Sequence, residues 1–346
     1  MCGFPTRASR PIAGAGDVTA DLVITNGDVA GELLRNTLQG AEVLPWRDVL
    51  YEGPVPLTGT LEDLTKLRVE HLAASGGGER AAIEFELTAR DRGLATSPNF
   101  DRVMLWFEHD LYDQLQLLQV LDWFAANPRD PGSLVLVQTE DFIGRQAPEV
   151  IGSLAGTEEA LIPEQLDLAR HAWTAFRQMT PETWAALLGE DLTGLRFLRP
   201  SVLRMLEELP GVDGLSRTER EILKAVQAGP AMAVAVFMAV QNQEDAQFMG
   251  DWSFWRLLDQ LALAEEPLIE GLNAAPFRHD VPEFAEPYLK STPRLTALGQ
   301  EVLDGGGDWA AHFGVDRWWG GTHLTRDSVW RWNGAEERLV APGAAA

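Results

Sequence analysis

Residues 102–125, which read RVMLWFEHDLYDQLQLLQVLDWFA, decide the fold of this chain. The run from Arg102 to Phe107 is almost continuously apolar, as in a strand that is covered on both faces of a parallel sheet. After the polar phrase Glu108-His109-Asp110, apolar residues recur at helical spacing from Tyr112 to Ala125. The stretch therefore predicts a strand that leads through a polar turn into a helix.

The same alternation continues on both sides of this stretch. Short strands are expected at 21–26, 41–46 and 132–137, and helices at 29–38, 61–74 and 79–94. Strands that alternate with helices favour an α/β fold, so we expect an open parallel, Rossmann-like sheet within residues 17–160. Residues 1–16 lack the apolar core of a signal peptide and are expected to be a disordered leader.

The second half of the chain is mainly helical. Residues 161–214 are expected to form a helical connector, and Ser216 with Glu219 has the pattern of a capping box that opens a new unit. Helices near 216–228, 230–240, 251–264 and 294–303, followed by short terminal strands, make residues 215–346 resemble a winged-helix α+β module.

Charge and composition exclude several classes of function. The chain has 346 residues with 28 Lys and Arg against 52 Asp and Glu, a net charge of −24. Such a chain repels phosphate backbones, and the expected recognition helix at 251–264 is itself acidic, so nucleic acid is not an expected partner. A single cysteine, Cys2, and the lack of an 18-residue apolar window favour a cytoplasmic protein without a membrane segment.

Common catalytic and nucleotide-binding motifs are missing. The first strand–helix turn lacks the three glycines of a dinucleotide fingerprint, and no Gly-Lys-Ser/Thr loop or Gly-x-Ser-x-Gly elbow occurs. Gly27-Asp28 is similar to the start of a Gly-Asp-Ser esterase motif, but Val29 occupies the position of the nucleophile. Neither serine esterase chemistry nor a specific cofactor is therefore predicted.

Polar residues at the ends of three expected strands form the candidate site. They are Asn26, Gly27 and Asp28 after the first strand, Arg47 and Asp48 after the second, and Glu108, His109 and Asp110 after the third. In an open parallel sheet, ligands bind beyond the carboxyl ends of the strands. We therefore expect these residues, apart from Gly27, to surround one cleft.

Each residue has a functional and a structural interpretation. In the functional one, His109, Asp110 and Asp28 are the catalytic candidates, and Asn26, Gly27, Arg47, Asp48 and Glu108 bind the ligand. In the structural one, Asp28 and Asp110 cap helices, and Arg47 and Asp48 pair with the acids in a network. The acids lie in separate loops, so their spacing predicts no metal site.

Several phrases resemble the bacterial family called domain of unknown function 1835. They are residues 24–28 (ITNGD), Arg47-Asp48 with Gly53-Pro54, and residues 106–115 (WFEHDLYDQL), and the resemblance covers about residues 20–145. The carboxyl-terminal phrases Gly250-Asp251, Asp308-Trp309 and residues 316–321 (DRWWGG) also look like proteins that carry this domain. The family is uncharacterised, so the resemblance implies no reaction.

Two functional hypotheses follow. In the first, the α/β domain binds a small polar or anionic ligand, such as a nucleotide-like compound. It either catalyses a reaction of that ligand or only binds it. In the second, the chain is a non-enzymatic regulator or scaffold whose winged-helix-like module contacts a protein. The sequence leaves open whether the chain is an enzyme.

Overall fold

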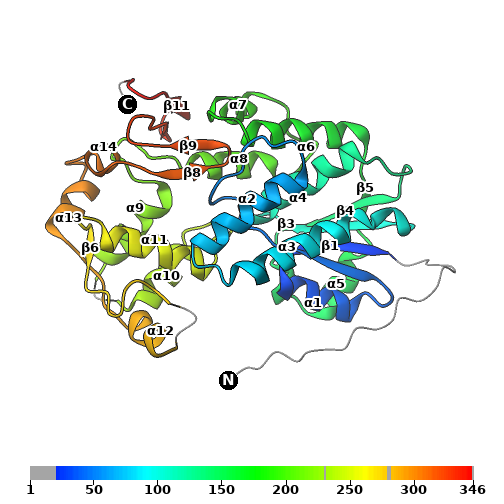
Figure 1. Ribbon diagram of the computed structural model, residues 1–346, viewed down its shortest axis with the longest axis horizontal. Helices are drawn as coiled ribbons and strands as arrows, with labels where there is room; N and C mark the ends of the chain where they lie inside the picture. Colours follow the sequence, from blue (N-terminus) through cyan, green and yellow to red (C-terminus); the bar gives the residue numbers. More distant parts are fainter. Residues whose placement is uncertain (1–20, 230, 279–281, 345–346) are drawn as a thin grey trace.

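The central element is a five-stranded sheet with the order β2-β1-β3-β4-β5 (Figure 1). The computed structural model describes residues 21–229, 231–278 and 282–344, so the expected leader at 1–16 lies outside the described residues. Four strands are parallel, and the short β5 pairs antiparallel with β4 at the edge. The strands are β1 (Leu22–Asn26), β2 (Glu42–Trp46), β3 (Val103–Glu108), β4 (Leu134–Thr139) and β5 (Glu159–Ala160). The predicted α/β sheet is confirmed.

Helices cover both faces of this sheet (Figure 1). Successive side chains of a strand point to opposite faces, so Val23 and Trp106 enter one apolar cluster while Ile24 and Phe107 enter another. The first face is covered by α1 (Asp28–Thr37) and α5 (Pro148–Leu154). The second face is covered by α2 (Leu61–Ala74), α3 (Arg80–Ala95), α4 (Leu111–Ala126) and α6 (Pro163–Phe176).

The rest of the chain is helical with three short antiparallel strand pairs. The remaining helices are α7 (Glu182–Ala186), α8 (Leu198–Leu206), α9 (Arg217–Gln227), α10 (Ala233–Gln241), α11 (Asp251–Leu263), α12 (Pro282–Leu289), α13 (Ala297–Leu303) and α14 (Trp309–Phe313). The strand pairs are β6 (Ile269–Glu270) with β7 (Arg294–Leu295), β8 (Arg317–Trp319) with β9 (Thr322–Leu324), and β10 (Arg331–Asn333) with β11 (Arg338–Val340). The predicted capping box is present, because Ser216 Oγ accepts from Glu219 N at 3.2 Å and Glu219 Oε2 accepts from Ser216 N at 2.6 Å.

The turn between β8 and β9 packs against the end of α6. Gly321 N donates to Phe176 O at 3.0 Å, and Val55 N donates to Gly320 O at 2.8 Å. A Cβ atom on Gly321 would lie 1.9 Å from the carbonyl oxygen of Arg177, so only glycine fits this approach. One hydrophobic cluster accordingly extends from the sheet to the carboxyl-terminal strands.

Candidate functional site

The candidate site lies at the carboxyl edge of the sheet, where the neighbours of β1 lie on opposite sides of it. From β1 the chain continues to β2 on one side, while β3 lies on the other side. Such a switch point is where parallel sheets bind ligands, because the loops that leave the two strands diverge. Asn26 ends β1 and Glu108 ends β3, so both predicted residues border the switch point.

Three buried carboxyl groups meet beside it. Oxygen atoms of Glu108, Asp110 and Asp113 lie within 4.8 Å of one another, and we call these residues the carboxylate cluster. Asp110 Oδ1 accepts from Asp113 N at 3.1 Å, which confirms the predicted cap on α4. Glu108 Oε1 accepts from Ile143 N at 2.7 Å. The side-chain amide of Asn26 and the backbone N–H of Glu108 donate to Asp113.

Burial raises the pKa of every carboxyl group in the carboxylate cluster. Burial, reinforced by the charge of Glu108, raises the pKa of Asp110 to about 8. The pKa of Asp113 is raised well above its usual range, first by burial and then by its two acidic neighbours. Burial also raises the pKa of Glu108. Three such groups can share protons, and their oxygen atoms are the hard ligands that a divalent cation prefers.

Asp28 and Arg47 form a separate ion pair at the surface. Arg47 Nε donates to Asp28 Oδ2 at 2.9 Å, and Arg47 Nη2 donates to Asp28 Oδ1. This contact holds the pKa of Asp28 below its usual range. Gly27, with φ of 45°, is the N-cap of α1, and the side chain of Asp28 forms no capping bond. The structural interpretation of Asp28 as a cap is therefore wrong, whereas its pairing with Arg47 is present.

Asp48 forms a buried ion pair. Its side chain is fully buried against Arg68, whose Nε donates to Asp48 Oδ1 at 2.9 Å, and Arg90 Nη1 lies 3.7 Å from the other oxygen. Arg68 also donates to the carbonyl oxygens of Val49 at 2.8 Å and Glu52 at 2.6 Å. Asp48 thus holds the arginine that fixes the loop after β2.

The His109 side chain packs beside two aromatic rings. Its ring lies 5.8 Å from the ring of Phe197 and 6.3 Å from that of Phe142, measured between centroids. Within the described residues, its buried Nδ1 atom has no hydrogen-bond partner. His109 lines a small cavity of about 130 Å³ beside α8. The predicted residues therefore divide among several places instead of surrounding one cleft.

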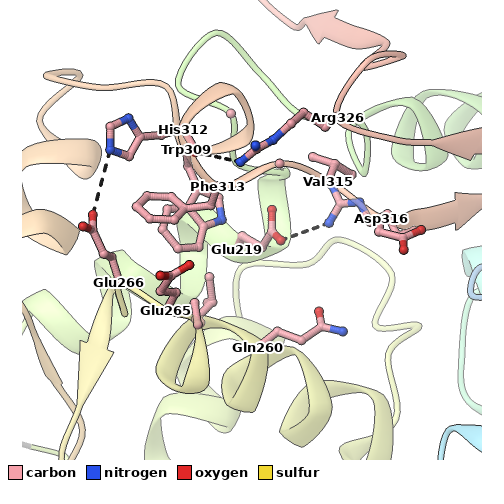
Figure 2. Close-up of a pocket in the computed structure, with 15 residues that line it drawn as sticks. Glu219, Gln260, Glu265, Glu266, Trp309, His312, Phe313, Val315, Asp316 and Arg326 are labelled. Atoms are coloured by element: carbon pink, nitrogen blue, oxygen red, sulfur yellow. Dashed lines mark hydrogen bonds and ion pairs between the residues drawn. The ribbon is translucent and has the colours of Figure 1, made fainter.

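Three larger cavities lie near or within the carboxyl-terminal part. The sheet-edge cavity, of about 440 Å³, is bordered by Arg47, Tyr112, Trp252 and Phe277. The junction cavity, of about 280 Å³, is bordered by Glu52, His71, Arg256 and Trp318. The α14 cavity, of about 590 Å³, is shown in Figure 2.

Several polar groups of the α14 cavity pair with one another. In Figure 2, Trp309 and Phe313 lie side by side, with ring centroids 4.0 Å apart. Glu219 pairs with Arg317 at 3.0 Å, and Arg326 Nη2 donates to the carbonyl oxygen of His312 at 3.3 Å. This cavity therefore offers fewer free groups to a ligand than its size suggests.

The sequence interpretation missed the partners that complete these sites. Asp113 had a usable signal, because an acid three residues after a helix cap lies in the first turn, beside that cap. Arg68 and Arg90 also had one, because each stands at helical spacing between two leucines, in line with the apolar face of its helix. Trp252 had no local signal, since only the packing of α11 against the sheet domain brings it to Arg47.

Comparisons with family models and with curated proteins found no match to this chain. The resemblance to domain of unknown function 1835 thus stays a prediction. Among the helices of the described residues, none is both long and apolar enough to cross a membrane.

Proposed function

We propose that this protein binds a small ligand with a planar ring, such as a nucleoside or nucleoside monophosphate, in the sheet-edge cavity. The observation that carries the proposal is that Arg47, predicted to bind a ligand, borders a cavity of about 440 Å³ with three aromatic side chains. Ligand sites are typically apolar concave surfaces with a few converging polar groups, often between domains. This cavity has that composition.

The apolar part of the cavity suits a flat ring. Tyr112 comes from the first turn of α4, Trp252 from α11, and Phe277 from the segment after β6. Leu72 of α2 and Leu87 of α3 add aliphatic surface. Aromatic rings stack favourably against other ring systems, and these side chains supply such faces from both halves of the chain.

The polar side chains of the cavity suit a ligand that accepts hydrogen bonds at one end and donates them at the other. Arg47 uses its Nε and Nη2 groups on Asp28, and its Nη1 group has no hydrogen-bond partner within the described residues. An incoming carboxylate or phosphate would share this guanidinium. Glu86 and Asp251, also at the cavity, would accept from hydroxyl or amino groups.

The net charge of −24 favours ligands that carry little negative charge. A strongly acidic protein repels multiply charged anions, so we expect nucleosides and monophosphates to bind more tightly than triphosphates. The proposal assigns binding and no reaction, because neither His109 nor Asp110 borders this cavity.

We also propose that α9, α10, α11 and α13 with β6 and β7 form a winged-helix-like module that closes this site. Its helix α11 carries Asp251 and Asp259, which disfavour a DNA-reading role. The same helix supplies Trp252 to the sheet-edge cavity. The module then serves the ligand site, and a protein partner stays the alternative hypothesis.

Calorimetry with adenosine, guanosine, uridine and their 5′-monophosphates and triphosphates tests the proposal. We expect saturable binding by wild type, a loss of at least about tenfold in Trp252→Ala, and a smaller loss in Arg47→Gln. Phe85→Ala is the matched control, because Phe85 is 74% exposed on α3 and should leave binding unchanged. Absence of binding by wild type, or equal binding by Trp252→Ala, would overturn it.

A further inference from the structure

The junction cavity is a second, partly enclosed space between the two halves of the chain. Its volume is about 280 Å³. Glu52 and His71 border it from the sheet domain, and Arg256, Leu257 and Gln260 of α11 border it from the other side. None of these residues borders the sheet-edge cavity. Arg256 contacts Trp252, which does border it, so Gln260 is the side chain that tests the junction cavity separately from the sheet-edge cavity.

Arg256 has unused hydrogen-bond donors at this cavity. Its Nη1 group donates to Glu52 Oε2 at 2.7 Å, and its guanidinium lies 4.7 Å from the ring centre of Trp252. Glu52 is its one hydrogen-bond acceptor among the described residues, and the side chain is 28% exposed. A guanidinium has five N–H donors, so Nε and Nη2 remain free for an acceptor in the cavity.

The acids at the cavity already have partners. Glu52 pairs with Arg256 at 2.7 Å, Glu208 with Arg204 at 2.7 Å, and Asp316 with His323 at 2.7 Å. Gln260, which is exposed, makes no side-chain hydrogen bond within the described residues and adds an amide group. The unused polar groups of this wall are therefore mainly donors.

His71 adds a neutral imidazole. Its ring lies over Gly53, where a Cβ atom would come within 2.2 Å of the ring. Its Nε2 atom is buried and has no hydrogen-bond partner in the part of the chain that the structure describes. Burial and the charges of Arg68 and Arg256 lower the pKa of His71 to about 4. His71 is thus uncharged near neutral pH and adds no positive charge to that of Arg256.

The remaining surface is apolar. Met249 and Leu257 border the cavity together with the indole rings of Trp318 and Trp319. A ligand that fills this space needs an apolar body in addition to the group that faces Arg256, because water against such surface is unfavourable.

We propose that the junction cavity is a binding site for a small organic anion, a monocarboxylate with an apolar body, which Arg256 holds through its free guanidinium donors. Arginine recognises carboxylates through two parallel N–H···O bonds, and the partly enclosed cavity strengthens this contact relative to the open surface. This site does not depend on the proposed nucleoside site.

Benzoate is a suitable probe, with benzamide as its uncharged counterpart and benzylamine as its cationic counterpart. Calorimetry and ligand-observed NMR on the full chain should show saturable benzoate binding that weakens as salt increases. Benzamide should bind at least about tenfold more weakly, because its interaction with the guanidinium lacks the ionic component. Benzylamine should not bind.

Variants locate the site. Arg256→Gln should weaken benzoate binding at least about tenfold. Arg326→Gln, which borders the adjoining α14 cavity and not the junction cavity, should leave it unchanged. Because Arg256→Gln also removes the partner of Glu52, Gln260→Glu serves as a second variant that adds a repelling charge at an exposed position. Equal binding of benzoate and benzamide, absence of binding by wild type, or full binding by a folded Gln260→Glu variant would overturn the proposal.

Discussion

The side-chain amide of Asn26 donates a hydrogen bond to the carboxylate of Asp113, 87 positions further along the chain. Asn26 ends β1 and Asp113 lies in the first turn of α4, so this bond joins a strand end to a helix start at the switch point of the sheet. Asp113 is fully buried, and its other oxygen accepts from the backbone N–H of Glu108. The bond therefore ties the end of β1 to the carboxylate cluster.

Replacing Asn26 by alanine should destabilise the protein by about 1–3 kcal/mol, because it leaves a buried carboxylate oxygen without its donor. Urea unfolding at pH 7, followed by circular dichroism, measures this change. Asn36→Ala, at an exposed position of α1, is the control and should stay within about 0.5 kcal/mol of wild type. Equal stability of both variants would show that the bond contributes nothing.

Asp110→Asn should make the protein more stable at alkaline pH. Folding raises the pKa of Asp110 to about 8 from 3.8, so the folded state binds the proton more tightly than the unfolded state does. The proton on Asp110 stabilises the folded state fully below about pH 4, and this stabilisation is lost as the pH rises towards 8. Asparagine never ionises and still caps α4.

Melting temperatures at pH 5 and pH 8.5 test the direction of this pH dependence. We expect wild type to lose stability between the two values more steeply than Asp110→Asn, which should melt higher at pH 8.5. Asp101→Asn, at an exposed position, should follow wild type. A parallel pH dependence in wild type and Asp110→Asn would contradict the prediction.

Removing Arg68 should be among the most damaging single changes in the sheet domain. Arg68 and Asp48 are both fully buried, and deleting one partner of a buried ion pair costs about 3–5 kcal/mol. Arg68→Met leaves Asp48 with Arg90 at 3.7 Å as its remaining cation. The exposed pair of Arg47 with Asp28 should matter much less, so Arg47→Gln is expected to cost at most about 1 kcal/mol.

The double variant Asp48→Asn, Arg68→Met separates a charge effect from a packing effect. Because it removes both buried charges, it should be more stable than Arg68→Met in the same urea titration. If both variants unfold at the same urea concentration, the loss comes from packing and the charge argument is wrong.

The sequence predicted the sheet well because its signals are local. The apolar run at 102–107 and the helical spacing that follows need no partner to be recognised, and β3 and α4 lie within one or two residues of the prediction. The capping box at Ser216 is equally local, since both of its bonds join residues three apart.

The single cleft was not predictable in this way. The strand ends identify residues at one edge of the sheet, but the direction of each side chain depends on partners far along the chain. Asp48 turns towards Arg68, 20 positions later, and Arg47 borders a cavity completed by Trp252. Neither α2 nor α11 shows in its own sequence that it packs at this edge.

The packing of the β8–β9 turn on α6 gives the last prediction. A Cβ atom on Gly321 would lie 1.9 Å from Arg177 O and 2.7 Å from Gln178 O, and backbone atoms cannot rotate away as side chains do. Gly321→Ala must therefore move the turn, which breaks the bond from Gly321 N to Phe176 O and disturbs Trp319, whose Nε1 donates to Met205 O at 2.8 Å. We expect a loss of about 2 kcal/mol or more in urea unfolding, because overpacking and a lost buried hydrogen bond act together. Gly334→Ala provides the matched comparison, since its Cβ would lie no closer than 3.7 Å to its neighbours and should change stability little. If the two alanine variants unfold alike, the turn yields to the added methyl group and does not fix the carboxyl-terminal strands on α6.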